Sequence, residues 1–166
     1  MPDKAIEKTN AMRLLDQRRI AYEAYTYDPS IHVATEVAEV LGFAPDEVYK
    51  TLVVLPEAST GERRRPLLVM IASQREMDPR LLARSIGVKS VRMAPKVEAE
   101  RLTGLQVGGI GALALIGKGF DVYLDAPALA RERILVNGGR RGLNLRLRVA
   151  DLIAITGARV VDATAT

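Results

Sequence analysis

The sequence predicts an α+β fold in which a mixed, largely antiparallel sheet is surrounded by helices. Short runs of β-branched and leucine residues indicate strands, and amphipathic helical patterns separate them at irregular intervals. The regular strand-helix alternation of a doubly wound parallel sheet is missing from the pattern. Because 166 residues suffice for one domain with a sizeable core, we expect residues 1–166 to form a single domain.

The first part of the chain is expected to form two helices and an intervening strand. Apolar residues at helical spacing predict a helix over residues 4–18. The alternating aromatic run YEAYTY, from Tyr22, predicts a strand. A second helix is expected over residues 35–41, because Gly42 stands where a helix C-cap belongs.

Two apolar runs in the middle of the chain predict a β-hairpin. KTLVVL begins at Lys50, and LLVMIA contains Leu68. The polar segment between them, PEASTGERRRP, includes Gly61 and is typical of a hairpin loop. The continuous apolarity of both runs indicates strands that are buried on both faces.

The remaining sequence mixes further strands and helices in an irregular order. Asp78 and Pro79 are typical of the N-cap and the first position of a helix. The expected elements are a helix ending at Gly87, a strand at 90–93, a helix from Pro95 to Gly104, strands at FDVYLD, ILVN and NLRLRV, and a helix over 149–156 ended by Gly157. The tail ARVVDATAT is expected to fray at its last few residues.

The composition limits the chemistry that the protein can perform. Cysteine is absent and His32 is the one histidine, which excludes disulfides, thiolate nucleophiles and metal sites built from Cys or His. A metal could be held only by carboxylates, and we expect no metal site and no cofactor. The charged N-terminus does not resemble a signal peptide, and no apolar run reaches membrane-spanning length, so a cytoplasmic protein with no membrane partner is expected. A net charge of +4 permits an anionic partner but supports one only weakly.

Glycines are concentrated between residues 107 and 126. Gly109, Gly111 and Ala114 match the dinucleotide-binding pattern G-x-G-x-x-G/A. That pattern requires a crossover helix before the next strand, and the following ALALIGKG is too short to form one. The simpler interpretation is a tight bend with unusual backbone angles. The other is a loop that aims N–H groups at a charged oxygen, and the second loop NGGRRG, from Asn137, favours such a pocket.

Lys50 is a second candidate for the site because it stands directly before a buried strand. At that position it could offer three donors to a phosphate or a carbonyl group, or it could be a solvated charge at a strand end. His32, in the loop DPSIHVATE, is expected to have a capping or surface role, although a loop near Tyr27 could face a pocket.

Four blocks of the sequence together resemble the YbaK/EbsC family, the YbaK and prolyl-tRNA synthetase-associated domain. In the family's order they are YTYD from Tyr25, EVYKTL from Glu47, TGLQVGGI from Thr103 and VNGGRRGL from Val136. The likeness extends over about residues 11 to 162, and the ordered set is more specific than any one block.

The resemblance implies a mixed, barrel-like β core, surrounding helices and a pocket for the 3′ end of a mischarged tRNA. It implies a trans-editing aminoacyl-tRNA deacylase of the Cys- or Ala-tRNA(Pro) type, independent of metal, whose partners are mischarged tRNA and an aminoacyl-tRNA synthetase. The implied catalytic residues are Lys50, Gly108, Gly109 and Ile110, and the implied substrate-binding residues are Tyr27, Thr51, Asn137, Gly138, Arg140 and Asn144.

The chain departs from the family pattern in the presumed aminoacyl pocket. GGIGALAL replaces the family's G-G-[IV]-S-P-[LF]-G, and Asn137 and Asn144 replace the serine and aspartate of V-S-G-G-K-R-G-L-D. The amino acid specificity therefore does not carry over. A noncatalytic tRNA- or synthetase-binding module of the same fold remains the alternative, because a fold alone does not establish activity. Hydrolysis of an activated aminoacyl ester would require little beyond positioning and an oxyanion site.

Overall fold

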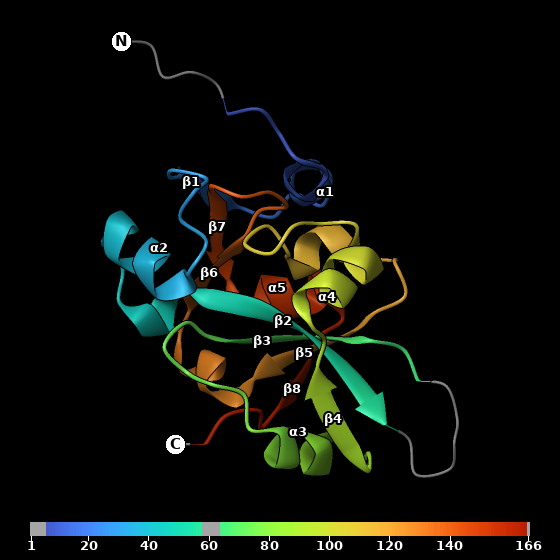
Figure 1. Cartoon of the computed structure of the whole chain (residues 1–166). Helices are drawn as coiled ribbons and strands as arrows, with labels where there is room; N and C mark the ends of the chain where they lie inside the picture. Colours follow the sequence, from blue (N-terminus) through green and yellow to red (C-terminus); the bar gives the residue numbers. More distant parts are fainter. Residues whose placement is uncertain (1–5, 58–63, 166) are drawn as a thin grey trace.

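Two β-sheets form the centre of the molecule, and helices cover them (Figure 1). The computed structural model describes residues 6–57 and 64–165. Along the chain the elements are α1 (Asn10–Gln17), β1 (Tyr22–Thr26), α2 (Ala34–Leu41), the 3-10 helix η1 (Pro45–Glu47), β2 (Tyr49–Glu57), β3 (Leu67–Ala72), α3 (Pro79–Ile86), β4 (Ser90–Met93), α4 (Lys96–Thr103), η2 (Ala112–Leu115), β5 (Asp121–Asp125), η3 (Ala126–Ala130), β6 (Arg133–Asn137), β7 (Leu143–Arg148), α5 (Val149–Thr156) and β8 (Arg159–Val161).

The sheet topology confirms the mixed, largely antiparallel prediction. One sheet has the order β4-β2-β3-β5-β8 and the other has the order β1-β7-β6. Only the β3–β5 and β5–β8 pairs of the described strands are parallel. A parallel bridge between Val48 and Leu135 joins the two sheets. In the described part of the chain the strands therefore form an open, barrel-like core rather than a closed barrel.

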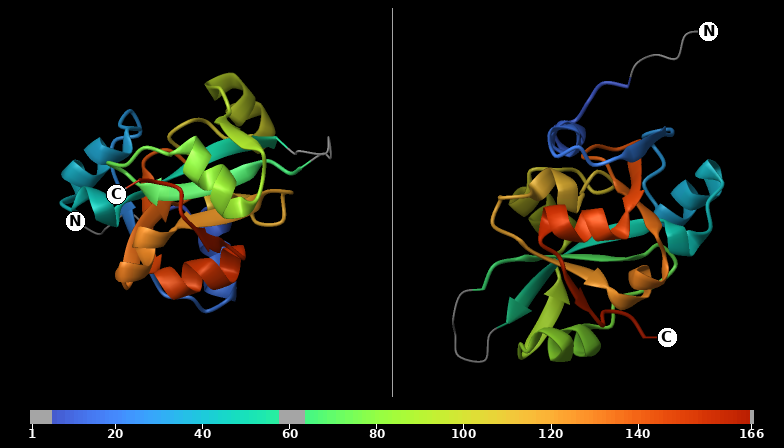
Figure 2. Two further views of the ribbon diagram at one scale, coloured as in Figure 1. Left: turned by 90° about the horizontal axis from the view of Figure 1, so that it is seen from below. Right: turned by 180° about the vertical axis from the view of Figure 1, so that it is seen from behind.

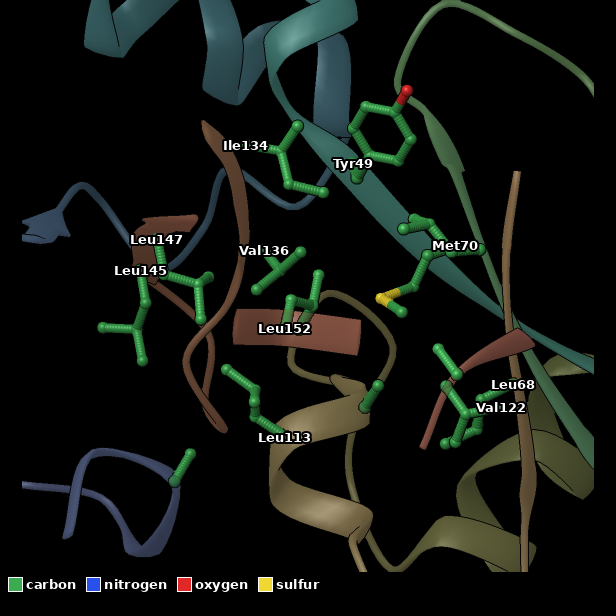
Figure 3. Packing of buried hydrophobic residues seen from close by; sticks show 14 of the residues in the cluster. Tyr49, Leu68, Met70, Leu113, Val122, Ile134, Val136, Leu145, Leu147 and Leu152 are labelled. Carbon is green, nitrogen blue, oxygen red and sulfur yellow. The ribbon is translucent and has the colours of Figure 1, made fainter. Parts of the chain in front are cut away.

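The main hydrophobic core lies between the two sheets. Leu68 and Met70 of β3 lie on one side of this core, and Leu145 and Leu147 of β7 lie on the other (Figure 3). Leu152 of α5 packs between the two pairs. Each of these side chains is essentially inaccessible to solvent, and burial of one stabilises the fold by about 1.5–3 kcal/mol. The view from behind shows α5 on the side of the molecule opposite α4 (Figure 2).

The central strand β3 is buried on both faces, as its continuous apolarity predicts. Leu68 and Met70 enter the core between the sheets, whereas Val69 and Ile71 pack in a second cluster with Leu82 of α3. The alternation of side chains along a strand separates the two sets. The predicted β2–β3 hairpin is antiparallel, and its loop with Gly61 lies outside the described residues.

The first helix is shorter than predicted. It begins at Asn10 because the Thr9 hydroxyl accepts a hydrogen bond from the Met12 N–H at 3.2 Å and caps the helix there. Residues 6–9 are not helical, and residues 4 and 5 lie outside the described residues. The predicted cap of α3 is present, with the Asp78 carboxylate accepting from two N–H groups at 3.1 Å each.

The prediction that the last few residues of the C-terminal tail fray is wrong for Ala163 and Thr164. Residues 159–161 form β8, which extends the larger sheet beside β5. Beyond it, the Ala163 N–H donates to the Asp125 carboxylate at 2.8 Å, and the Thr164 hydroxyl donates to the same group. Asp125 is 1% exposed, so the tail satisfies a buried carboxylate. Strand β8 has only 3 residues, which is too short for an alternating pattern to predict it.

Two further expectations concern the glycine pattern and the membrane. After Gly111 the chain forms only the 3-10 helix η2 before β5, so the rejection of a dinucleotide-binding loop is confirmed. The second expectation concerned membrane-spanning segments. Within residues 6–57 and 64–165, no helix has the length and apolarity needed to span a bilayer.

Candidate active site

The largest concentration of predicted site residues surrounds one cavity of about 430 Å³. Helices α2 and α4 flank the cavity, and the first half of β2 forms its floor. The walls are mainly aliphatic, with a small number of polar groups, which is typical of a small-ligand site. The lining residues that matter below are Tyr27, His32, Lys50, Thr51, Lys96, Gly108, Ile110, Asn137 and Asn144.

The floor of the cavity is an unpaired strand edge. β2 pairs with β3 from Tyr49 onward but pairs with β4 only from Val54. In an antiparallel pair, successive residues direct their backbone N–H and C=O alternately toward and away from the partner strand. The Ser73 N–H donates to the Val48 carbonyl at 2.8 Å, so the backbone groups of Thr51, three residues further on, point away from β3. These two backbone groups face the cavity side of the strand and can bind a ligand.

Lys50 is half-buried in this floor. Its ammonium group donates to the Ser73 carbonyl at 3.1 Å, which leaves further N–H donors for a ligand. Burial lowers the pKa of Lys50, and the Glu76 carboxylate partly opposes that effect. Ser73 is itself anchored by a hydrogen bond from its hydroxyl to the Pro45 carbonyl. The lysine is therefore held by a hydrogen bond to the backbone, and it forms no salt bridge within the described ranges.

Two polar side chains beside Lys50 are available to a substrate. The Thr51 hydroxyl oxygen is buried and has no hydrogen-bond partner within the described part of the chain. A buried hydroxyl without a partner is costly, which indicates that a ligand completes this site. Across the cavity, the Tyr27 hydroxyl donates to the Asn144 side-chain oxygen at 3.4 Å. Burial raises the pKa of Tyr27, so the phenol stays protonated.

Gly108 occupies a place on the rim that only glycine fits. Its φ of 89° lies in the left-handed region, and an added Cβ would come within 2.3 Å of the His32 Cβ. The Gly109 N–H is used within the turn, because it donates to the Gln106 carbonyl at 2.7 Å. No internal acceptor for the N–H groups of Gly108 and Ile110 occurs among the described residues. Those two groups are the donors that this loop can offer to an oxyanion.

Asn137 ties the two glycine loops together. Its amide nitrogen donates to the carbonyls of Gly108 and Arg140 at 3.0 Å each, while its oxygen accepts from the Gly139 N–H at 2.7 Å. The Arg141 guanidinium adds a bond to the Val107 carbonyl at 2.8 Å. The side chain of Asn137 is thus committed to the protein, and its contribution is to hold the Gly108 loop in place.

The cavity contains most, but not all, of the residues that the sequence singled out. Lys50, Thr51, Tyr27, Gly108, Ile110, Asn137 and Asn144 line it. Gly109 packs against the backbone of residues 140 and 141, and Gly138 packs against Leu143. Arg140 donates at 3.4 Å to the Glu7 carbonyl in the N-terminal segment. These last three are brought near the site without lining it.

Two residues at the site, Lys96 and Ser73, were not predicted from the sequence, and the expectation for His32 was right only in part. His32 lies on the cavity wall, and it is not a helix cap, because α2 begins after Val33 without a side-chain cap. Lys96 lines the rim at the start of α4, and Ser73 lines the cavity beside Lys50. The position of His32 in the loop after Tyr27 was a weak signal, whereas Ser73 depends on the β2–β3 register and left no local signal.

The polar groups around the cavity favour acyl-transfer chemistry. In the ranges 6–57 and 64–165, no group of three or more His, Asp or Glu residues is arranged to hold a metal ion. A cation, the backbone N–H groups of Thr51, Gly108 and Ile110, and a tyrosine hydroxyl are placed around the cavity. Such preorganised donors stabilise developing negative charge on a carbonyl oxygen.

Comparison with known proteins identifies the family of this fold and site. Residues 28–155 match the family model of the aminoacyl-tRNA editing domain, and the chain belongs to that family. It is 31% identical to EbsC of Enterococcus faecalis, a protein proposed to be a Cys-tRNA(Pro)/Cys-tRNA(Cys) deacylase, over 97% of this chain and 96% of that protein. It is also 28% identical to the proline–tRNA ligase of Shouchella clausii, over 76% of this chain but only 20% of the ligase.

Solved structures share the fold along nearly the whole chain. The hypothetical protein APE2540 superposes with a TM-score of 0.80 at 26% identity, covering 92% of this chain and 97% of that one. The structure of a proposed trans-editing enzyme for prolyl tRNA synthetase has a TM-score of 0.74 at 23% identity, covering 96% and 100%. This chain therefore shares its overall fold with these solved structures.

Proposed function

We propose that this protein is a trans-editing deacylase that hydrolyses the ester of a mischarged aminoacyl-tRNA, of the Cys- or Ala-tRNA(Pro) type. The main support is the position of Lys50 on the floor of an aliphatic cavity whose rim offers the free N–H groups of Gly108 and Ile110. The family membership and the name of the Enterococcus faecalis relative point to the same class of substrate.

The proposed reaction is a simple ester hydrolysis. A water oxygen adds to the ester carbonyl carbon while the N–H groups of Gly108 and Ile110 stabilise the carbonyl oxygen as it gains negative charge. The bond between that carbon and the ribose oxygen then breaks. The leaving ribose oxygen takes up the proton that the attacking water gives up, which yields free amino acid and uncharged tRNA. Lys50 holds the terminal ribose-phosphate or polarises the carbonyl, and no metal or cofactor enters the reaction.

The substrate preference follows from the limits of synthetase selection. A synthetase pocket gains only about 1–3 kcal/mol per methylene, so it charges some tRNA with amino acids that are too small. A second site of limited size can remove them afterwards. A cavity of about 430 Å³, shared between an amino acid and the tRNA end, suits that role. The proposal places the protein in the cytoplasm, with mischarged tRNA and a synthetase as its partners.

The test is a deacylation panel with two lysine variants. The wild-type protein is incubated at catalytic amounts with tRNAs charged with alanine, cysteine, serine or proline, and ester loss is followed over time. We expect multiple turnovers on at least one mischarged tRNA, and a loss of about 100-fold or more in Lys50→Ala. Lys118→Ala, an exposed lysine outside the cavity, is the matched control and should retain full activity.

Two outcomes would contradict the proposal. If Lys50→Ala folds normally and hydrolyses every substrate at the wild-type rate, the site is elsewhere. If the wild-type protein binds charged tRNA and leaves every ester intact, the protein is a noncatalytic binding module. Full activity after exhaustive chelation is expected, and its loss would show that a metal takes part.

A further inference from the structure

A basic groove lies outside the cavity, between α3 and β4. It has a volume of about 490 Å³ and is lined by Arg80, Arg84 and Lys89, with Ala83 and Val91 among its apolar residues. Arg80 and Arg84 are four residues apart on α3 and therefore project from the same face of the helix. All three cationic residues are exposed to solvent.

The three cations of this groove are free to bind an anion. None of them forms a salt bridge within the described ranges. Of the carboxylates near the groove, Asp78 caps α3 and Glu57 accepts from the Ser90 hydroxyl at 2.7 Å. Asp162, whose N–H donates to Ser85 of α3 at 3.0 Å, is exposed and forms no salt bridge with the three cations within the described ranges. Like charges gathered without partners are unfavourable, so their presence on one groove indicates a polyanionic ligand.

Strand β4 connects this groove to the cavity. Ser90, at the start of the strand, lines the groove, whereas Met93, at its end, lines the cavity together with Ala94. Figure 1 shows β4 leading from α3 to α4. At about 3.3 Å per residue, the four steps from Lys89 to Met93 span about 13 Å. That distance corresponds to a few nucleotides of an unpaired RNA strand, and Lys96 lines the cavity just beyond Met93, at the start of α4.

We propose that the groove of Arg80, Arg84 and Lys89 binds the phosphates of the tRNA acceptor strand whose 3′ end enters the cavity. The proposal rests on the function proposed above, since it assigns the rest of the same substrate to this surface. Contacts of this kind are made to the sugar-phosphate backbone of the RNA. They add affinity and make binding depend on salt, but they do not distinguish one RNA sequence from another.

A binding assay separates this proposal from the hydrolysis reaction. The probe is an uncharged, fluorescently labelled RNA hairpin with an acceptor stem and a single-stranded CCA end, and Kd is measured by anisotropy at several salt concentrations. Arg80→Gln/Arg84→Gln should raise Kd about tenfold and reduce the slope of log Kd against log salt by about 2. Arg80→Lys/Arg84→Lys keeps both charges and should bind nearly as well as the wild-type protein.

The matched control removes two arginines from another helix. Arg13 and Arg18 belong to or cap α1, which lies at the opposite end of the molecule from α3 (Figure 1). Arg13→Gln/Arg18→Gln should leave Kd and its salt slope unchanged. An equal loss in this control, or an unchanged Kd in Arg80→Gln/Arg84→Gln, would overturn the proposal.

A second substrate shows whether the groove assignment or the proposed function is wrong. Aminoacyl-adenosine carries the ester but none of the acceptor-strand phosphates, so the Arg80→Gln/Arg84→Gln variant should hydrolyse it at the wild-type rate while its KM for charged tRNA rises. A lower rate on aminoacyl-adenosine would instead indicate damage to the cavity and would contradict the groove assignment. If the wild-type protein binds the hairpin through the groove but hydrolyses neither substrate, only the proposed function fails.

Discussion

Individual residues at the cavity are placed for binding at a cost to stability. Lys50 keeps a charge in a half-buried position with one internal acceptor, the Ser73 carbonyl. The hydroxyl of Thr51 is buried with no internal partner in the described part of the chain. Both arrangements are unfavourable in the free protein and favourable once a ligand supplies the missing contacts. They indicate which side chains a substrate touches.

Lys50→Met is predicted to preserve or increase stability while it removes activity. Methionine retains much of the aliphatic chain and eliminates the buried charge. Because burial lowers the pKa of Lys50, the unfolded chain binds more protons than the folded protein between that lowered value and the ordinary value of 10.5. Wild-type stability therefore rises with pH through that interval.

The stability advantage of the Lys50→Met variant should thus be largest near neutral pH and shrink as the pH approaches 10.5. Urea unfolding of both proteins at several pH values measures this difference. A variant that is clearly less stable than the wild-type protein at pH 7 would show that the charge is stabilised by its surroundings.

Gly108→Ala is predicted to destabilise the protein and to impair deacylation. The new methyl group meets both a left-handed backbone and the His32 Cβ, so the rim must shift. We expect a loss of about 2–4 kcal/mol in the free energy of unfolding, together with a lower kcat. Gly117→Ala is the control, because Gly117 also has a positive φ of 77° but has open space around it.

The two glycine variants separate backbone strain from crowding. Gly117→Ala should lose only about 1 kcal/mol and keep full activity. Adding His32→Gly to Gly108→Ala removes the colliding Cβ and should restore part of the stability. Equal losses in the two single variants would mean that contact with His32 is unimportant.

At the level of elements, the segment after β8 stabilises the larger sheet through a buried carboxylate. Asp125 ends β5 and accepts hydrogen bonds from the Ala163 N–H and the Thr164 hydroxyl. This contact fixes the tail on the sheet, although the cavity lies elsewhere. It is therefore a structural feature that should be separable from activity.

Asp125→Ala is predicted to destabilise the protein by about 2–4 kcal/mol, because it leaves two buried donors without an acceptor. Asp162→Ala, which removes an exposed carboxylate from the same segment, should change the free energy of unfolding by less than about 0.5 kcal/mol. Urea titrations provide both values. Deacylation per folded molecule should be unchanged in both variants, and a specific loss in Asp125→Ala would connect the tail to the site.

At the scale of the whole molecule, local sequence signals predicted the elements better than the site. Caps such as Asp78 and Gly42 act within a few residues, so they could be recognised directly. The role of Asn137 could not, because it depends on the approach of two loops that are separated by 29 residues in the chain. The same is true of Ser73, which reaches Lys50 only through the register of β2 and β3. The resemblance to a family added Asn137 to the candidate residues, but it did not point to Ser73.

The open edge of β2 also bears on how the protein avoids self-association. An unpaired strand edge can template the addition of a strand from another molecule, which is a common route to aggregation. Here β4 leaves the edge at Ala94, where Pro95 begins the turn into α4, so only a short stretch around Thr51 stays uncovered. Because α2 and α4 flank that stretch, it is recessed from any neighbouring sheet. The protein can therefore present strand hydrogen-bonding groups to a small ligand without presenting them to another copy of itself.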